Sequence, residues 1–134
     1  MEKTLCIIKP NAVAKGFVDK INEKITGSGL AIINSKKILI SKEIAEKFYA
    51  EHSERPFFGE LVDFMISGDA VVQILEGENA VKSYRALMGA TNPDEADEGT
   101  LRAEFAESLS KNAVHGSDST DSAEREIEIM SDIF

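Results

Sequence analysis

The chain has 134 residues, of which 43% are hydrophobic, and this length suffices for the core of one ordinary domain but not of two. Its formal net charge of −9 argues against a nucleic-acid binder, because such proteins need a broad basic surface to displace the counterions of the phosphates. No run approaches the roughly 18 apolar residues that span a bilayer, and the first residues lack the layout of a signal peptide. We therefore expect a single domain over residues 1–134, a cytoplasmic location, and neither a membrane nor a specific nucleic acid as partner.

The first forty residues are predicted to form a strand, a helix and a second strand. The apolar run over residues 4–9 predicts a buried strand, which Pro10 ends because it cannot donate a ladder hydrogen bond. Apolar residues then recur at helical spacing over residues 18–25, and glycines follow as a stop. Residues 30–40 carry β-branched residues in partial alternation and predict a strand. Cys6 lies in the first apolar run, and we expect it to be buried as a small hydrophobic residue.

The middle of the chain is predicted to contain three helices and a third strand. Ser41 is suited to cap the first of these helices, and Pro56 to begin the second. Residues 70–75 are predicted to form the strand. Residues 79–88 have an apolar stripe at helical spacing, with Gly89 as the stop.

The last third of the chain has a weaker pattern. Residues 89–111 contain turn signals and one short helical piece at residues 101–106, and loops of this length in a small domain are usually functional or disordered. Residues 112–115 are predicted to form a fourth short strand, and Asp121 with Glu124 resembles a capping box that opens the last helix. This order of elements fits either an antiparallel α+β sandwich or a small parallel α/β sheet.

His115 is the residue at which several chemical signals meet. It ends a predicted strand, and Gly116 and small hydroxyl residues follow it. A histidine near neutral pH has an unprotonated ring nitrogen that can attack phosphorus, and the resulting phosphoramidate can pass its phosphoryl group on. A histidine in a polar segment is more often a bystander, and His52, near the end of a predicted helix, is interpreted as one.

Glu126 strengthens the interpretation of His115. It shares one face of the predicted last helix with apolar residues, so its carboxylate points toward the body of the protein. The alternative is a glutamate at the edge of the apolar stripe whose carboxylate reaches water. In the functional interpretation, Glu126 and Ser117 fix the ring of His115, because a buried carboxylate needs partners and a nucleophile needs an orienting group.

The sequence lacks both the Gly-x-x-x-x-Gly-Lys-Ser/Thr loop and the Gly-x-Gly-x-x-Gly spacing, so side chains would have to hold any phosphate. Phe57 and Phe58 cannot share one face of a helix, so one of the two could face solvent as a stacking platform for a base. The polar candidates for phosphate contacts, each of which alone is typical of a solvated surface residue, are Lys9, Arg85, Thr91 and Arg102.

The chain closely resembles the nucleoside diphosphate kinase family, from about residue 2 to the last helix. The motif Asn112-x-x-His115-Gly116-Ser117-Asp118-Ser119 matches the family's signature around its phosphorylated histidine, and the segments at residues 8–13, 55–58, 75–77, 89–93 and 99–102 also match. The resemblance implies a ferredoxin-like α/β (α+β) sandwich, in which helices cover a four-stranded antiparallel sheet. It also implies an enzyme that transfers the γ-phosphate of a nucleoside triphosphate to a nucleoside diphosphate by a ping-pong mechanism.

The resemblance further implies a role for each matching residue. His115 would be the nucleophile, with Glu126 and Ser117 orienting it. The nucleotide-binding residues would be Arg85, Thr91 and Arg102 for the phosphates, Tyr49 beside the transferred group, Lys9 and Asn112 for the sugar hydroxyls, and Phe57 and Leu109 for the base. The cofactor would be Mg²⁺, carried by the nucleotide phosphates without metal ligands from the protein. The protein partner would be further copies of the chain, in a tetramer or a hexamer.

Two alternatives share this fold. An inactive binding or regulatory module is disfavoured because every catalytic position that can be mapped is intact. A histidine phosphocarrier that serves a protein partner would need His115, but it would have no use for Phe57, Lys9 and Asn112.

Overall fold

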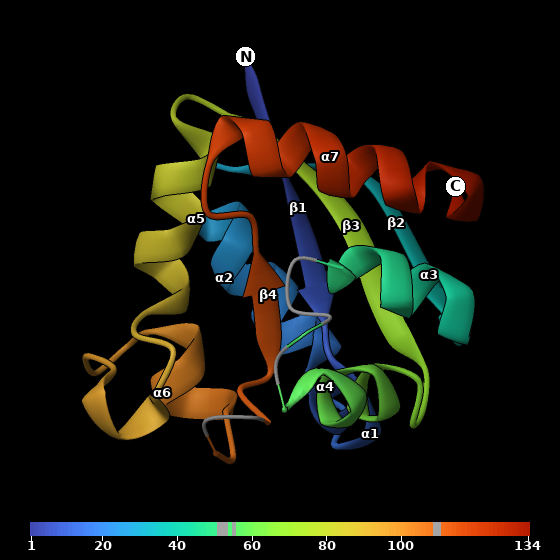
Figure 1. The fold of residues 1–134 in the computed structure, drawn as a ribbon. Coiled ribbons are helices and arrows are strands. Elements are labelled where there is room, and N and C mark those ends of the chain that lie inside the picture. Colours follow the sequence, from blue (N-terminus) through green and yellow to red (C-terminus); the bar gives the residue numbers. More distant parts are fainter. Residues whose placement is uncertain (51–53, 55, 109–110) are drawn as a thin grey trace.

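The computed structural model describes residues 1–50, 54, 56–108 and 111–134, and at its centre lies a four-stranded antiparallel sheet (Figure 1). The strands lie side by side in the order β2-β3-β1-β4. In chain order their bounds are β1 Glu2–Ile8, β2 Ala31–Ile38, β3 Ala70–Gly77 and β4 Val114–Gly116. The antiparallel sandwich is therefore the correct alternative of the two that the order of elements allowed.

Strand β1 occupies a central position in the sheet. It pairs with β3 along its whole length, from Glu2 opposite Gly77 to Ile8 opposite Val71, and with the short β4 over three residues at its other edge. The five residues that end β1 are all buried. This explains the continuous apolar run in the sequence, because a strand that is covered on both faces has no polar side.

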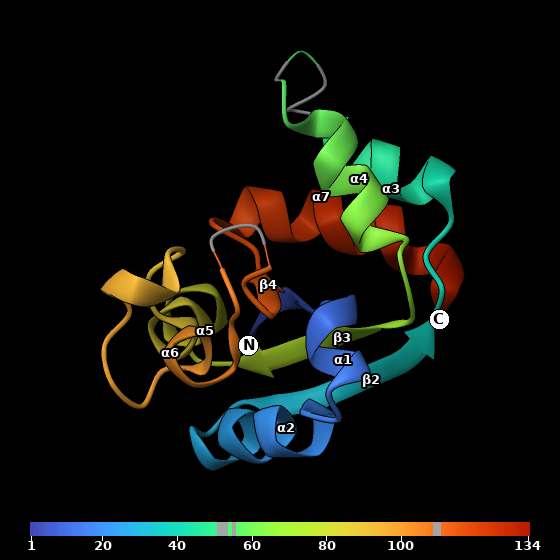
Figure 2. The same ribbon diagram turned by 90° about the horizontal axis from the view of Figure 1, so that it is seen from below.

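Helices cover both faces of the sheet (Figures 1 and 2). One core joins alternate residues of β1, Cys6 and Ile8, to α1, α2, α5 and α6. The other joins Leu5 and Ile7 to α3, α4 and α7. The helix bounds are α1 Pro10–Ala14, α2 Val18–Gly27, α3 Lys42–Phe48, α4 Phe58–Met65, α5 Ala80–Met88, α6 Leu101–Phe105 and α7 Thr120–Met130, with 3₁₀ turns η2 at Pro93–Glu95 and η3 at Ser131–Ile133.

Most predicted elements are confirmed, and three local predictions need correction. The fourth strand covers Val114–Gly116 and not residues 112–115, because the φ of 74° at Ala113 turns the chain just before it. Residues 10–14 form the helix α1, whereas Pro10 had been assigned only as the end of a strand; a proline also suits the first position of a helix, because its missing N–H would have no partner there. The cap of α7 is Ser119 and not Asp121, since the Ser119 Oγ accepts a hydrogen bond of 3.0 Å from the backbone N–H of Ser122. Among the described residues, no helix combines the length and the apolarity that a membrane span requires.

Candidate functional site

The centre of the candidate site is His115, in the middle of β4. Its side chain is 20% exposed, and its Nε2 donates a hydrogen bond of 2.8 Å to Oε1 of Glu126 on α7. Ser117 Oγ donates to the same oxygen at 2.8 Å, and itself accepts from the backbone N–H of Leu5 at 3.3 Å. The central strand β1 therefore holds the serine, the serine holds the carboxylate, and the carboxylate holds the imidazole.

The carboxylate of Glu126 is buried and does not reach to water. The residue is 5% exposed, and its partners are His115 and Ser117 on one oxygen, with Arg125 at 3.8 Å from the other. A buried carboxylate without such partners would carry a large desolvation penalty. Its position on the inward face of α7 thus serves a polar cluster within the core of the protein.

The protonation of His115 suits a nucleophile. Burial lowers the pKa of the imidazole, as do the charges of Lys9 and Arg102, while the hydrogen bond with Glu126 and the charge of that residue raise it. The burial effect is the largest, so the ring is neutral at neutral pH. Because the Glu126 carboxylate accepts from Nε2, the single ring proton lies on Nε2 and the lone pair that can attack phosphorus lies on Nδ1.

Two buried cations lie near this histidine. Lys9 follows β1 and donates from Nζ to Oδ1 of Asn112 at 2.8 Å; burial, together with the charge of Arg102, lowers its pKa to about 7. Arg102 on α6 donates at 3.1 Å to the carbonyl oxygens of Gly89 and Val114. Its Nε is buried without a partner among the described residues. A guanidinium has five N–H donors, so three remain after the two carbonyl contacts.

A strained turn leads into β4. The backbone N–H of Val114 donates to the carbonyl of Asn112 at 2.9 Å, which makes a γ-turn about Ala113, whose φ is 74°. The carbonyl of Ala113 accepts from the backbone N–H of Lys9 at 2.7 Å. The turn therefore joins the segment that holds Asn112 to the end of β1 that holds Lys9. The sequence carries no sign of it, since alanine rarely adopts a positive φ.

The end of α3 completes the surroundings of His115. Tyr49 is buried, and burial and the charge of Glu126 raise the pKa of its hydroxyl. The ring of Phe48 lies at a centroid distance of 4.8 Å from the imidazole, with an angle of 79° between the planes. Phe48 is the neighbour that the sequence alone did not reveal, because its place on the inward face of a helix indicated only a core residue.

The remaining predicted residues lie farther out. Arg85 and Thr91 are exposed, on α5 and in the loop after it, and the charge of Arg85 contributes to the lowered pKa of Arg102. Phe57 is 42% exposed while Phe58 packs against the core, which confirms that one of the two phenylalanines faces solvent. Helices α6 and α4 flank the start of β4 on opposite sides (Figures 1 and 2). Leu109 and His52 lie outside the described residues.

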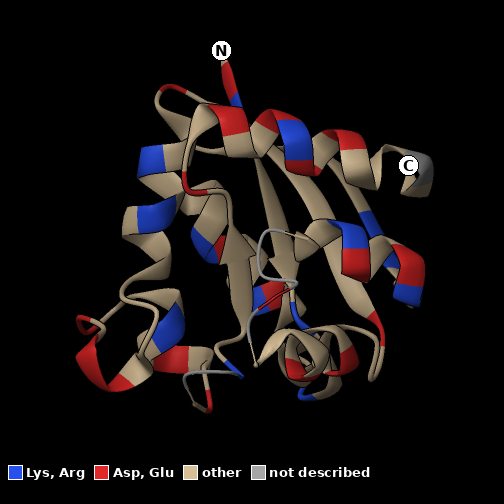
Figure 3. Ribbon diagram, in the orientation of Figure 1, with Lys and Arg blue, Asp and Glu red and all other residues tan. Residues whose placement is uncertain are grey.

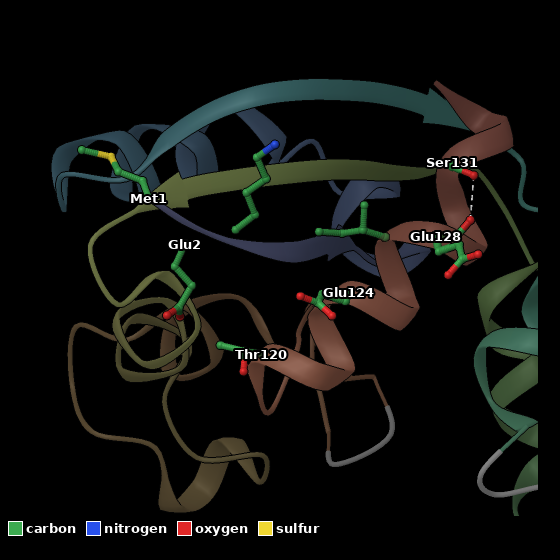
Figure 4. Close-up of a pocket in the computed structure, with 8 residues that line it drawn as sticks. Met1, Glu2, Thr120, Glu124, Glu128 and Ser131 are labelled. Carbon is green, nitrogen blue, oxygen red and sulfur yellow. Dashed lines mark hydrogen bonds between the residues drawn. The ribbon is translucent and has the colours of Figure 1, made fainter.

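The site around His115 and a pocket at the other end of β1 differ in the charge of the side chains that line them. Acidic side chains are spread over α3, α4, α7 and the segment before α6, whereas Lys and Arg are found on α5 and α6 (Figure 3). The pocket has a volume of about 470 Å³, and the charged residues of its lining are three glutamates, Glu2, Glu124 and Glu128, and one lysine, Lys3 (Figure 4). An anionic ligand would be repelled there, so the basic cluster around His115 is the better place for phosphates.

Comparisons with known proteins agree with this geometry. The family model described as "Nucleoside diphosphate kinase" matches residues 2–132. A nucleoside diphosphate kinase of Campylobacter jejuni is 62% identical over 130 residues, which cover 97% of this chain and 95% of the relative. The structure is similar to that of the Aquifex aeolicus nucleoside diphosphate kinase, with a TM-score of 0.94 and 43% identity, over 96% of this chain and 94% of the other. It is also similar to a Halobacterium salinarum nucleoside diphosphate kinase in complex with CDP, with a TM-score of 0.92 and 38% identity, over 96% and 86% of the two chains.

Proposed function

The chain belongs to the nucleoside diphosphate kinase family, and we propose that this phosphotransferase works through a phosphohistidine formed at Nδ1 of His115. The observation that supports this most is the pair of 2.8 Å hydrogen bonds on Oε1 of Glu126, because they hold the Nε2 atom of the imidazole in place and fix the tautomer of the ring. A neutral ring with its proton held on Nε2 presents an unprotonated nitrogen for attack.

In the first half of the reaction one P–O bond breaks and one P–N bond forms, and in the second half the P–N bond breaks and a new P–O bond forms. In the first half, the Nδ1 lone pair attacks the γ-phosphorus of a nucleoside triphosphate, and the electron pair of the breaking bond stays with the diphosphate that leaves. The imidazole gains positive charge as it attacks, and the buried carboxylate of Glu126 stabilises that charge through Nε2. The second half is the reverse, with a different nucleoside diphosphate as acceptor, which makes the mechanism ping-pong.

Other site residues would hold the nucleotide in place. The free donors of Arg102, together with Arg85 and Thr91, would bind the phosphates, and Tyr49 would lie beside the transferred group. Lys9 and Asn112 would bind the sugar hydroxyls, a role supported by their mutual hydrogen bond of 2.8 Å close to the nucleophile. The exposed ring of Phe57 would stack on the base, and Leu109 would cover the other face of the base.

Magnesium would be carried by the nucleotide phosphates. The donors near His115 are an ammonium, a guanidinium and an amide, and no group of three or more metal-ligating side chains is found in the part of the chain that the structure describes. This donor set fits the phosphate oxygens of a magnesium nucleotide, in which the ion keeps several of its waters. When bound, the ion neutralises charge on the phosphates.

The assembly and the location are also part of the proposal. We propose one domain over residues 1–134 and a homo-oligomer, a tetramer or a hexamer. The edge strand β2 supports this, because Ile33 is 45% exposed on it and Leu39 just after it is 57% exposed, and an edge strand of this kind readily pairs with another chain. A cytoplasmic location follows from the proposed substrates, since nucleoside triphosphates are made and used there.

The experiment that tests this proposal follows the phosphate itself. The enzyme is incubated with magnesium and ATP labelled at the terminal phosphate, separated from free nucleotide, and then given GDP or CDP. We expect the enzyme to take up the label and to pass it to either diphosphate. His115→Gln should take up none, whereas His52→Gln, the matched control at the other histidine, should behave as wild type. A protein that takes no label is a binding module, and one that keeps its label is a phosphocarrier; either result would overturn the proposal.

A further inference from the structure

Phe48 lies against the proposed nucleophile, and it is absent from the groups assigned above to the nucleotide. It is the last residue of α3 and 5% exposed, and its ring is nearly perpendicular to that of His115 at a centroid distance of 4.8 Å. We propose that Phe48 is a positioning residue that fixes the plane of the His115 imidazole for attack on the γ-phosphate. This inference rests on the proposed function of His115.

The hydrogen bond with Glu126 does not fix that plane by itself. It holds one atom of the ring, Nε2, and the χ2 torsion of a histidine has a broad distribution, so the ring can tilt about this contact. A perpendicular aromatic neighbour restricts the tilt, because aromatic rings are in favourable contact in this geometry at centroid separations of about 4.5–7 Å. Glu126 and Phe48 therefore restrain the imidazole at two independent places, so that the lone pair on Nδ1 points in one fixed direction.

Phe48 is itself held firmly. Its ring makes a second edge contact with Tyr49, at a centroid distance of 5.0 Å and an angle of 88°. It also belongs to the core that α3 shares with α4, α7 and the sheet. A positioning residue needs a rigid base, because its own movement would pass directly to the group that it positions.

The same contact keeps water from one side of the imidazole. The charged groups that face the ring are Glu126 of α7, which raises its pKa, and Lys9 and Arg102, which lower it, while burial lowers it most. Tyr49, whose ring contacts that of Phe48, is buried near the carboxylate of Glu126. Removal of the Phe48 ring should admit water to the imidazole, weaken the burial effect and raise the pKa of His115.

The test compares variants that keep or lose the aromatic ring. Phe48→Leu retains an apolar side chain without the ring, and Phe48→Tyr retains the ring. The matched control is Phe17→Leu, which removes a similar ring contact at 5.0 Å from Phe105 on the other face of the sheet. For each variant, rapid-quench experiments measure the rate of His115 phosphorylation against ATP concentration, and NMR titration of the ring protons measures the pKa of His115.

For Phe48→Leu we expect the maximum rate of phosphorylation to fall on the order of tenfold, the scale of a small misplacement of a reacting group. The ATP concentration at half-maximum should stay the same, because no proposed nucleotide contact is lost, and the pKa of His115 should rise. Phe48→Tyr and Phe17→Leu should both retain the wild-type maximum rate and the wild-type pKa.

Three outcomes would overturn the positioning role. The first is that Phe48→Leu keeps the wild-type maximum rate of phosphorylation. The second is that Phe17→Leu loses as much of this rate as Phe48→Leu does. The third is that Phe48→Tyr loses as much of it as Phe48→Leu does. If Phe48→Leu does not fold, Phe48→Met is judged by the same criteria, since its longer chain fills more of the space. A wild-type enzyme that takes no phosphate on His115 would refute the function proposed for His115, and so is distinguished from all of these.

Discussion

At the scale of single residues, His115 and Glu126 form a pair whose protonation can be measured directly. The hydrogen bond and the charge of Glu126 raise the pKa of His115, against the larger lowering by burial. Glu126→Gln keeps an acceptor and removes the charge, so we expect the pKa of His115 to fall further. The variant should also lose about 2 kcal/mol of transition-state stabilisation, the scale of one hydrogen bond to a charged group, so its turnover rate should fall.

NMR titration of His115 in the wild type and in Glu126→Gln checks this expectation. A pKa of His115 that rises in Glu126→Gln would contradict the assigned role of the carboxylate.

The burial of Lys9 should make the free energy of unfolding depend on pH. Its pKa is about 7 in the folded protein against an ordinary 10.5, because the ammonium is buried. Between these values the unfolded chain binds a proton that the folded chain lacks, so the free energy of unfolding rises with pH. From pH 7 to pH 8.5 this residue alone should add about 1 to 2 kcal/mol. Below pH 7 its contribution levels off, since the folded protein then also binds the proton.

Urea unfolding of the ligand-free protein at several pH values measures this rise. Lys9→Met should lack it, whereas Lys42→Met, at an exposed lysine, should retain it. The window stops at pH 8.5 because the buried thiol of Cys6 has a raised pKa of about 11, and its effect on stability has the opposite sign above pH 9. An equal rise in wild type and Lys9→Met would show that Lys9 is charged in the folded protein.

The role of a single residue could be predicted from the sequence where a motif or a helix face around that residue indicates it. His115 and Ser117 stand in a recognisable motif, and the inward face of α7 indicated the position of Glu126. Phe48 and the turn at Ala113 could not be found in this way. Their importance comes from what the fold places beside them, an imidazole 4.8 Å away and the backbone of Lys9.

At the scale of elements, β4 is positioned by its packing on α5. A Cβ added at Gly116 would lie 2.6 Å from Cε of Met88 and 2.7 Å from Cδ2 of Tyr84, and both side chains are fully buried. Gly116→Ala should therefore push β4 from α5, at a cost in stability of about 1–3 kcal/mol. It should also lower activity, because His115 is the preceding residue of the same strand.

The matched control is Gly27→Ala, at the end of α2, where an added Cβ meets nothing within 4 Å. Thermal unfolding and turnover of both variants give the comparison. A Gly116→Ala enzyme with the stability and the activity of wild type would mean that this packing does not position the nucleophile.

Elements were predictable where one signal dominated. Strand β1 and helix α5 have apolar patterns without competing signals, and the predicted ends of both lie within two residues of the observed ends. Helix α1 was missed because Pro10 ends a strand and begins a helix at the same position. At the start of α7, Ser119, Asp121 and Glu124 all offer capping oxygens within six residues, and only the backbone geometry selects Ser119.

For the whole molecule, the hydrophobic pattern of the sequence could not predict which strands pair with each other. A list of elements does not state their neighbours, and the continuous apolar run of β1 is as typical of a parallel sheet as of this antiparallel one. The resemblance at the His115 motif resolved the choice, and the strand order β2-β3-β1-β4 confirms it.

The proposed assembly can be tested at the edge of the sheet. Ile33 lies at the irregularity in the pairing of β2 with β3 and is 45% exposed. Ile33→Lys should reduce the mass of the particle in sedimentation experiments, because a charge at an edge strand opposes pairing between chains. Asp19→Lys, on the exposed side of α2, is the control for the change in charge and should leave the mass unchanged. A monomer in the wild type would contradict the proposed oligomer, and an unchanged oligomer in Ile33→Lys would place its interface elsewhere.

Identification of the phosphorylated atom shows directly whether Nδ1 of His115 carries the phosphoryl group in transit. The enzyme is mixed with magnesium ATP, quenched in alkali at millisecond times, digested, and compared with phosphohistidine standards substituted at each ring nitrogen. We expect phosphate on Nδ1 of His115, since Glu126 occupies Nε2 at 2.8 Å, and we expect this phosphate to appear at least as fast as turnover. Phosphate on Nε2, on a serine or on another residue, or an adduct that forms more slowly than turnover, would contradict this expectation.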